Sequence, residues 1–185
     1  MIVKAVRTFI FWVYSDSRMA KLTKFSTDGP FSHMGIGFEL TDGSEIYFEA
    51  LKHDGFVGPK PISSVRKYVA ENTARKLVLE YTPLNEDISN RKLIECKKLV
   101  GTVGYYSFQL ALMGLSERYH FPVPRSPSRV VCSEAVSRIV FPEIDLRDSR
   151  RTRHDMVNPN SAWRRWLEIK CGYGYINKAT KAKGE

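Results

Sequence analysis

The chain has 185 residues, a length typical of one domain, and its hydrophobic content of 43%, with 12% aromatics, supports an ordinary core and excludes a disordered chain. A formal charge of +9 favours anionic partners, with nucleic acid, a phospholipid surface and an acidic cell-wall polymer all compatible, although no recognisable nucleic-acid module is present. The three cysteines are far apart, which argues against a disulfide framework or a zinc ribbon and favours a reducing compartment.

The N-terminal segment predicts a strand rather than a targeting signal. Lys4 and Arg7 precede the apolar run 9–14, which superficially resembles a signal peptide. That run is shorter than the ~7–15 residues of a signal-peptide core, and no small-residue cleavage site follows it. Its aromatic and β-branched composition predicts a core strand over residues 2–14. Since no segment approaches the ~20 apolar residues of a membrane span, we expect a cytoplasmic protein.

The next segments predict a short helix and then a hairpin. Residues 15–17 can cap a helix through about residue 25, and the Thr-Asp-Gly-Pro of residues 27–30 ends it. Two apolar, aromatic runs follow at 32–40 and 44–51. They are joined by Thr41-Asp42-Gly43, whose Asp-Gly pair is a strong hairpin signal.

The following part predicts a turn-rich connector over residues 55–61, a short helix near 63–69 and a further strand at 76–82. Asp87 can then cap a helix whose apolar residues recur at helical spacing. A second helical run covers residues 105–118.

Three prolines in the loop 120–128 prevent a helix until just before Cys132. The helix that begins there should end near Phe141, because Pro142 follows. A last helix starts at Asn158-Pro159, an N-cap followed by a proline in the first turn. After Gly172 we expect a loose basic tail.

Together these elements predict an α+β fold with an antiparallel sheet or partly open barrel packed against helices. We expect one domain over residues 1–177 and a basic flexible tail over 178–185.

Two segments carry the strongest chemical signal. His33 opens an apolar strand, and Cys132 opens a helix, where the helix dipole favours a thiolate that an imidazole can deprotonate. Glu49 lies on the strand that pairs back toward His33 and could orient the imidazole, since a buried carboxylate needs a partner. The alternatives are a small buried packing residue for Cys132, an ordinary core or surface histidine for His33, and a solvent-facing edge position for Glu49.

The motifs around these residues resemble the circularly permuted branch of the papain-like, NlpC-type cysteine hydrolases, the YiiX-like group. Residues 31–36 (Phe-Ser-His-Met-Gly-Ile) are similar to its histidine strand, and residues 46–50 (Ile-Tyr-Phe-Glu-Ala) to its glutamate strand. Residues 131–134 (Val-Cys-Ser-Glu) are similar to its cysteine helix. The order His, Glu, Cys is the permuted one. The Gly-Asp that often opens the first strand of this family is missing here.

The resemblance implies a permuted papain-like fold with Cys132 as nucleophile, His33 as general base and acid, and Glu49 as the residue that orients the imidazole. The backbone N–H of Cys132 would help to hold the oxyanion, with Tyr14 as a second donor and Ser133 beside the substrate. His53 is the alternative base. No metal or other cofactor is expected.

Three functions remain open from the sequence. The first is an amidase or peptidase that forms a thioester acyl-enzyme, with cell-wall peptides as one substrate class. The second is a lipid acyltransferase or lipase that uses the same site at an anionic membrane surface, through the basic C-terminal region. The third is a non-catalytic basic binding protein on the same fold.

Overall fold

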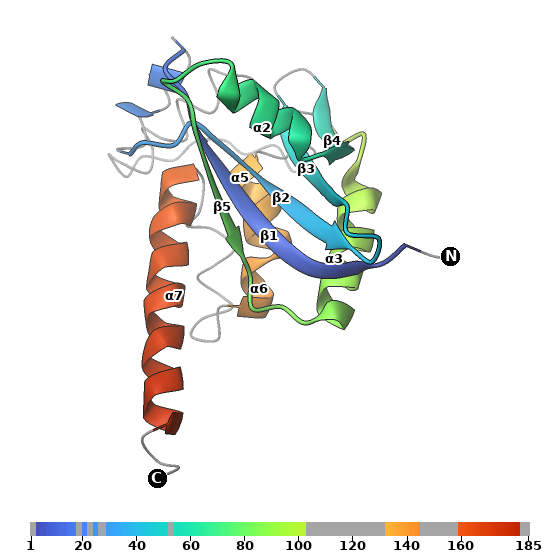
Figure 1. Ribbon diagram of the computed structural model, residues 1–185, viewed down its shortest axis with the longest axis vertical. Coiled ribbons are helices and arrows are strands. Elements are labelled where there is room, and N and C mark those ends of the chain that lie inside the picture. The colour runs from blue at the N-terminus through green and yellow to red at the C-terminus, as the bar shows by residue number, and fades with distance from the viewer. Residues whose placement is uncertain are drawn as a thin grey trace.

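The centre of the molecule is an open, five-stranded sheet in which every neighbouring pair of strands is antiparallel (Figure 1). The computed structural model describes residues 3–17, 20–21, 24–25, 29–51, 54–102, 132–144 and 159–181. Its elements are β1 (Ala5–Tyr14), β2 (His33–Leu40), β3 (Glu45–Leu51), β4 (Gly55–Pro61), α2 (Ser63–Ala70), β5 (Lys76–Tyr81), α3 (Glu86–Leu99), α5 (Cys132–Ile139), α6 (Phe141–Ile144) and α7 (Pro159–Lys181).

The strand order is β4-β3-β2-β1-β5, in which the predicted hairpin joins the neighbouring strands β2 and β3. Gly43 takes the left-handed conformation, with φ of 80°, and the carboxylate of Asp42 accepts a 2.9 Å bond from the Ser44 N–H. The α+β class and the antiparallel sheet are therefore confirmed, and the sheet is open rather than barrel-like.

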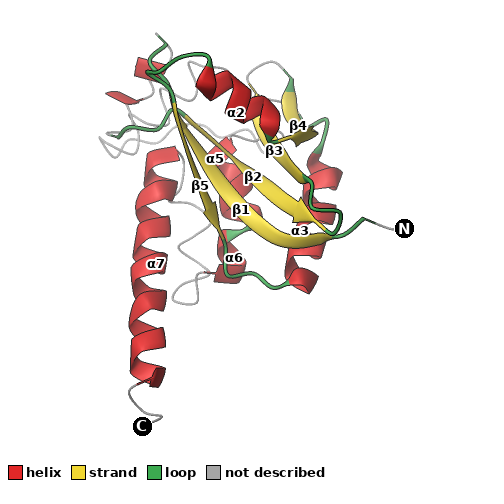
Figure 2. Cartoon of the chain, viewed as in Figure 1, coloured by secondary structure: helices red, strands yellow, loops and turns green. Residues whose placement is uncertain are grey.

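Successive side chains along each strand point to opposite faces of the sheet, so the core has one part on each face. One face packs against α3, α5 and α7, and Figure 1 shows α5 behind the strands and α7 beside β5. The other face carries α2, so helices flank both sides of the sheet (Figure 2). The buried strand residues of the larger core are Ala5, Ile10, Trp12, Met34, Ile36, Phe38, Phe48, Ala50 and Phe56. Those of the smaller core, on the α2 face, are Phe9, Phe11, Val13 and Tyr47.

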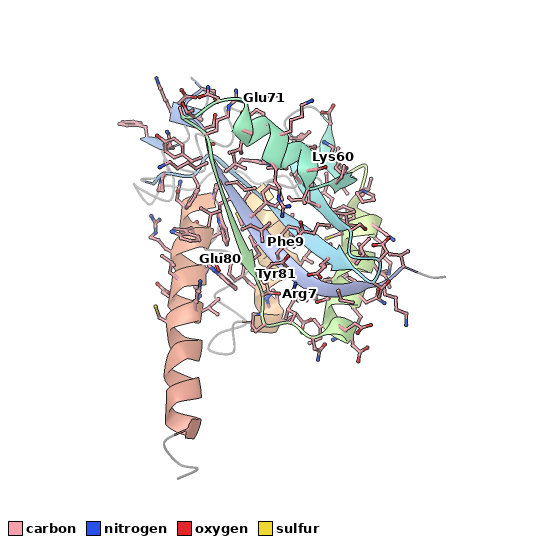
Figure 3. All side chains as sticks on the ribbon, viewed as in Figure 1. Arg7, Phe9, Lys60, Glu71, Glu80 and Tyr81 are labelled. Carbon is pink, nitrogen blue, oxygen red and sulfur yellow. The ribbon has the colours of Figure 1, made fainter. Side chains whose placement is uncertain are left out.

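Two glycines of β2 make room for aromatic rings on the α2 face. Gly35 pairs with Phe11, and Gly37 pairs with Phe9. A Cβ added to Gly35 would meet the Phe11 ring and would lie 2.6 Å from the Phe48 carbonyl oxygen. Arg7, Phe9 and Tyr81 also lie together on this face (Figure 3). The Arg7 guanidinium is 4.2 Å from the Tyr81 ring centroid.

We expect Gly35→Ala to lower the free energy of unfolding by about 1–3 kcal/mol, because the added methyl group overpacks against the Phe11 ring and a rigid carbonyl. Urea unfolding measures this change. Gly43→Asn is the control, since no atom lies within 4 Å of a Cβ at Gly43 and asparagine tolerates a positive φ. Equal stability of Gly35→Ala and the unmodified chain would contradict this packing.

The prediction of a connector over residues 55–61 is wrong, because the segment forms strand β4. Its two prolines are tolerated because β4 is an edge strand and pairs with β3 alone. Gly58 has a φ of 139°, and a Cβ at this residue would lie 2.8 Å from the Tyr47 carbonyl oxygen. Glycine is therefore required where β4 approaches β3.

Two helix boundaries also differ from the prediction. Helix α3 is capped by Asn85, whose side chain accepts a 2.9 Å bond from the Ile88 N–H, rather than by Asp87. Helix α5 ends at Ile139, and Pro142 lies in the separate α6, in a first turn where its missing N–H is tolerated.

Helix α7 runs to Lys181. It therefore continues past Gly172, where the sequence predicts the start of a loose tail, and past residue 178, where it predicts the start of a flexible segment. Glycine lowers helix propensity by about 1 kcal/mol but does not break a helix that is already propagating. Figure 1 shows the C-terminal half of α7 extending beyond the rest of the chain. The single domain over residues 1–177 stays a prediction.

Several other predictions lie outside the described residues. They are the helix at 105–118, the proline loop 120–128 and part of the helix at 15–25, of which residues 20–21 and 24–25 are helical. Within the part of the chain that is described, no helix combines the length and the apolar character that crossing a membrane requires.

Candidate active site

The structure brings His33 and Glu49 into direct contact. His33 is the first residue of β2. Glu49 lies on the neighbouring strand β3, close to the start of β2. The imidazole Nε2 is 2.8 Å from Glu49 Oε2. The His33 side chain is 22% exposed and that of Glu49 is 11% exposed, so solvent screens the pair only weakly. The prediction that the carboxylate faces the histidine rather than solvent is consistent with this geometry.

Glu49 also accepts bonds from two further groups at its other oxygen. Lys60 Nζ, from β4, is 3.1 Å from Glu49 Oε1, and the Tyr47 hydroxyl donates to the same oxygen at 3.3 Å. The Tyr47 hydroxyl is in turn 3.2 Å from the hydroxyl of Ser64 on α2. Both carboxylate oxygens are therefore held, and their plane is fixed relative to the imidazole.

These contacts decide the charge of Glu49. Burial of the carboxyl raises its pKa, but the hydrogen bonds and positive charges of His33 and Lys60 outweigh that effect and lower the pKa of Glu49 to about 2. The carboxylate is therefore ionised at any physiological pH. An ionised carboxylate bonded to one ring nitrogen favours the protonated form of the imidazole, as an orienting residue beside a general base does.

The His33 ring is also held by apolar contacts on the α2 face. The Phe11 ring packs edge-on against it with 6.4 Å between centroids, and Phe11 makes a similar contact with Tyr47 at 5.3 Å. Gly35 permits this arrangement because a side chain there would collide with Phe11. The Phe11 ring thus ties the packing of β1 to the orientation of His33.

Cys132 is the first residue of α5, where its prediction as the start of a helix is confirmed. Its side chain lies outside the described residues. Helix α5 contacts β2 and β3, and its buried Ala135, Val136 and Ile139 belong to the larger core. In Figure 1, α5 and β2 both begin toward the upper end of the molecule.

The two faces of the sheet constrain how a thiol could reach His33. His33 pairs with Val13 and shares its face, which carries α2, whereas α5 covers the opposite face. A group at the first residue of α5 can therefore meet the imidazole only around the N-terminal end of β2, where the strand begins. The position of His33 as the first residue of that strand permits such a meeting.

A side chain of α7 fixes the chain just before His33. Asn160, which is 1% exposed, accepts a 2.8 Å bond from the Phe31 N–H and donates a 2.8 Å bond to the Phe31 carbonyl oxygen. Gly29 gives Asn160 its space, since a Cβ at this glycine would lie 2.5 Å from Asn160 Cγ. The entry of β2 is thus clamped to the start of α7, 129 residues later in the sequence.

The two tentative site residues take different positions. Tyr14 ends β1 on the face opposite His33, and its ring centroid is 3.9 Å from Lys24 Nζ. Ser133 is fully buried in the first turn of α5. The roles of Tyr14 as an oxyanion donor and of Ser133 beside the substrate stay predictions. His53, the alternative base, lies outside the described residues.

The remaining cysteines are unlike a nucleophile at a helix start. Cys96 is fully buried in the larger core, and burial raises the pKa of its thiol far above the usual range. Cys171 is exposed on α7. The burial of Cys96 indicates a packing role.

Sequence reasoning misses Lys60 and Asn160. Lys60 reaches Glu49 because β4 is a strand that pairs Lys60 with Tyr47, and the prolines on either side of Lys60 conceal that strand. Asn160 has no sequence feature beyond its place at the start of a predicted helix. An asparagine in the first turn gives no local signal for a contact 129 residues away.

Comparison with known proteins shows the fold. No protein-family model matches the sequence, and no curated protein matches it. Among solved structures, the chain resembles the metalloprotein YiiX from Escherichia coli O157:H7, with a TM-score of 0.56 and 17% sequence identity. The match covers 86% of this chain and 92% of YiiX. The two proteins therefore share an α+β fold over most of their lengths.

Proposed function

We propose that the chain is a cysteine hydrolase on a permuted papain-like fold, with Cys132 as nucleophile, His33 as base and acid, and Glu49 as the residue that orients the imidazole. The observation that carries the proposal is the held His33–Glu49 pair at the start of β2. The start of α5 at Cys132 and the YiiX-like fold support it.

The contact between Glu49 and Nε2 supports one assignment of the proton transfers. Because Nε2 donates to the carboxylate, Nδ1 is the nitrogen that takes the proton of the Cys132 thiol. The resulting thiolate and imidazolium form an ion pair. Glu49 stabilises the imidazolium, and the N-terminal end of α5 stabilises the thiolate.

The reaction then proceeds in two steps. The Cys132 thiolate attacks the carbonyl carbon of an amide or ester, and the oxyanion is held by N–H groups at the start of α5. The tetrahedral intermediate collapses to a thioester as His33 gives its proton to the leaving amine or alcohol. Water, deprotonated by His33, attacks the thioester, which releases the acid and restores the thiol.

The substrate class is an acyl compound with an amide or ester bond, and cell-wall peptides are one class that the resemblance of the motifs suggests. The basic C-terminal region favours an anionic substrate or surface. The chemistry itself uses groups at the start of β2, on β3 and at the start of α5, and it does not depend on that basic region.

A metal has no step in this proposal, although YiiX is described as a metalloprotein. The described residues do not gather three His, Cys, Asp or Glu side chains in one place. His33 and Glu49 bind each other, and the Lys60 ammonium occupies the second carboxylate oxygen. A positive charge at 3.1 Å makes this carboxylate a poor cation ligand.

Reaction with p-nitrophenyl acetate tests the proposal. We expect a burst of nitrophenolate and an acetyl group on Cys132, located by mass spectrometry, because an activated thiolate reacts before the thioester hydrolyses. Cys132→Ala should abolish the burst, whereas Cys171→Ala, which removes the exposed cysteine of α7, should retain it. The proposal fails if Cys171 is acetylated as fast as Cys132, or if the burst survives in Cys132→Ala.

A further inference from the structure

Glu49 lies between two positively charged or chargeable groups from different strands. His33 Nε2 is 2.8 Å from one carboxylate oxygen, and Lys60 Nζ is 3.1 Å from the other. The Lys60 side chain is 39% exposed, whereas that of Glu49 is 11% exposed. The ammonium group thus lies at the solvent side of a mostly buried carboxylate (Figure 3 labels Lys60 beside α2).

The sheet register holds Lys60 in this position. β4 pairs Lys60 with Tyr47, so that Lys60 shares the α2 face with Tyr47 and Glu49. The ladder shifts by a residue between Tyr47 and Glu49, which brings the Lys60 side chain over the carboxylate. The close approach at Gly58 fixes β4 against β3 and therefore fixes the start of the Lys60 side chain.

Several of the described elements contribute groups to the cluster around Glu49 and His33. Among the described residues, the titratable or charged groups that contact Glu49 are His33 from β2, Tyr47 from β3 and Lys60 from β4. Helix α2 contributes the neutral Ser64 hydroxyl through Tyr47, and β1 contributes an apolar ring that packs on His33. Lys60 is therefore the charge that partly neutralises Glu49 from the side away from the imidazole.

We propose that Lys60 is a positioning residue that holds the Glu49 carboxylate and moderates the proton affinity of His33. A carboxylate without a second partner stabilises an imidazolium strongly. A cation on the far oxygen weakens that effect and keeps the imidazole able to release its proton to a leaving group. The consequence for catalysis rests on the proposed hydrolase function, whereas the effect on His33 does not.

The test is an NMR titration of the histidine ring protons in the full chain. His33→Gln identifies the His33 signal among those of the four histidines. In Lys60→Met we expect the titration midpoint of His33 to move to higher pH by about half a unit to one unit, because the compensating charge is lost. Lys60→Arg, which keeps the charge, should restore most of the original midpoint.

Lys97→Met is the matched control, since Lys97 is exposed on α3, on the other side of the sheet. An unchanged or lower His33 midpoint in Lys60→Met, with the fold intact by circular dichroism, overturns the proposal. Alkylation of Cys132 in the same samples separates the two proposals. A His33 shift without preferential reaction of Cys132 would retain the role of Lys60 and refute the hydrolase.

Discussion

Glutamine in place of Glu49 is expected to slow the alkylation of Cys132 at neutral pH by at least about tenfold. The loss of an adjacent opposite charge disfavours a protonated imidazole by about 1–3 pKa units, and the thiolate then loses its counter-ion. The remaining Lys60 ammonium adds to this effect, because it would lie near the imidazole without a carboxylate between them. Iodoacetamide kinetics followed by mass spectrometry measure the rate at each cysteine.

Glu45→Gln is the control for this change. Glu45 lies on the same strand and face, but it binds Arg66 and the Tyr81 hydroxyl rather than a histidine. In the Glu45→Gln variant, we expect Cys132 to be alkylated at the same rate as in the unmodified chain. Equal slowing in the two variants would mean that the effect comes from the stability of β3, and it would contradict an orienting role for Glu49.

The same Glu49→Gln variant should also alter acid stability. The pKa of Glu49 is lowered from 4.5 to about 2, so its ionised form stabilises the fold above pH 4.5, and this contribution is lost as the pH falls from 4.5 towards 2. The variant has no carboxylate at this position, so it loses no such stabilisation as the pH falls. Its free energy of unfolding should therefore fall less steeply over this pH range, which urea unfolding at several pH values would measure.

Aspartate in place of Asn160 is expected to lower the free energy of unfolding by about 3 kcal/mol or more. The substitution keeps an acceptor for the Phe31 N–H but replaces the donor to the Phe31 carbonyl with a second acceptor. It also places a carboxyl group at a position that is 1% exposed. Both effects loosen the entry of β2, so the reactivity of Cys132 should fall with the stability.

Asn72→Asp is the matched control, because the side-chain oxygen of Asn72, a half-buried residue, accepts a bond from the Ala74 N–H. Aspartate can make the same bond, and we expect little change in stability. If Asn160→Asp were as stable as Asn72→Asp, the link between α7 and the start of β2 would not contribute to the fold.

The sequence is sufficient to predict those parts of the molecule that depend on interactions between residues close together in the chain. The Asp42-Gly43 turn aligns β3 against β2, and this pairing brings Glu49 to His33. The start of α5 at Cys132 agrees with the prolines that precede it in the sequence. Hairpins and helices depend on residues a few positions apart, so the sequence predicts that they form, although the predicted cap of α3 is displaced by two residues, from the observed Asn85 to Asp87.

Contacts between distant segments are not predictable in the same way. Lys60 reaches Glu49 only because an edge strand tolerates Pro59 and Pro61, which locally indicate a connector. The bonds of Asn160 to Phe31 depend on how α7 packs against the sheet. Neither contact has a periodicity or spacing that marks it in the sequence.

The most direct test of the account is the pH dependence of Cys132 alkylation in the unmodified chain, with Cys171 as the internal reference. An ion pair with His33 predicts that Cys132 reacts much faster than Cys171 near neutral pH and keeps its reactivity at pH values where an ordinary thiol, with a pKa of about 8.5, is protonated. A Cys132 rate that matches that of Cys171 and rises only near that pKa would contradict the His33–Glu49–Cys132 site.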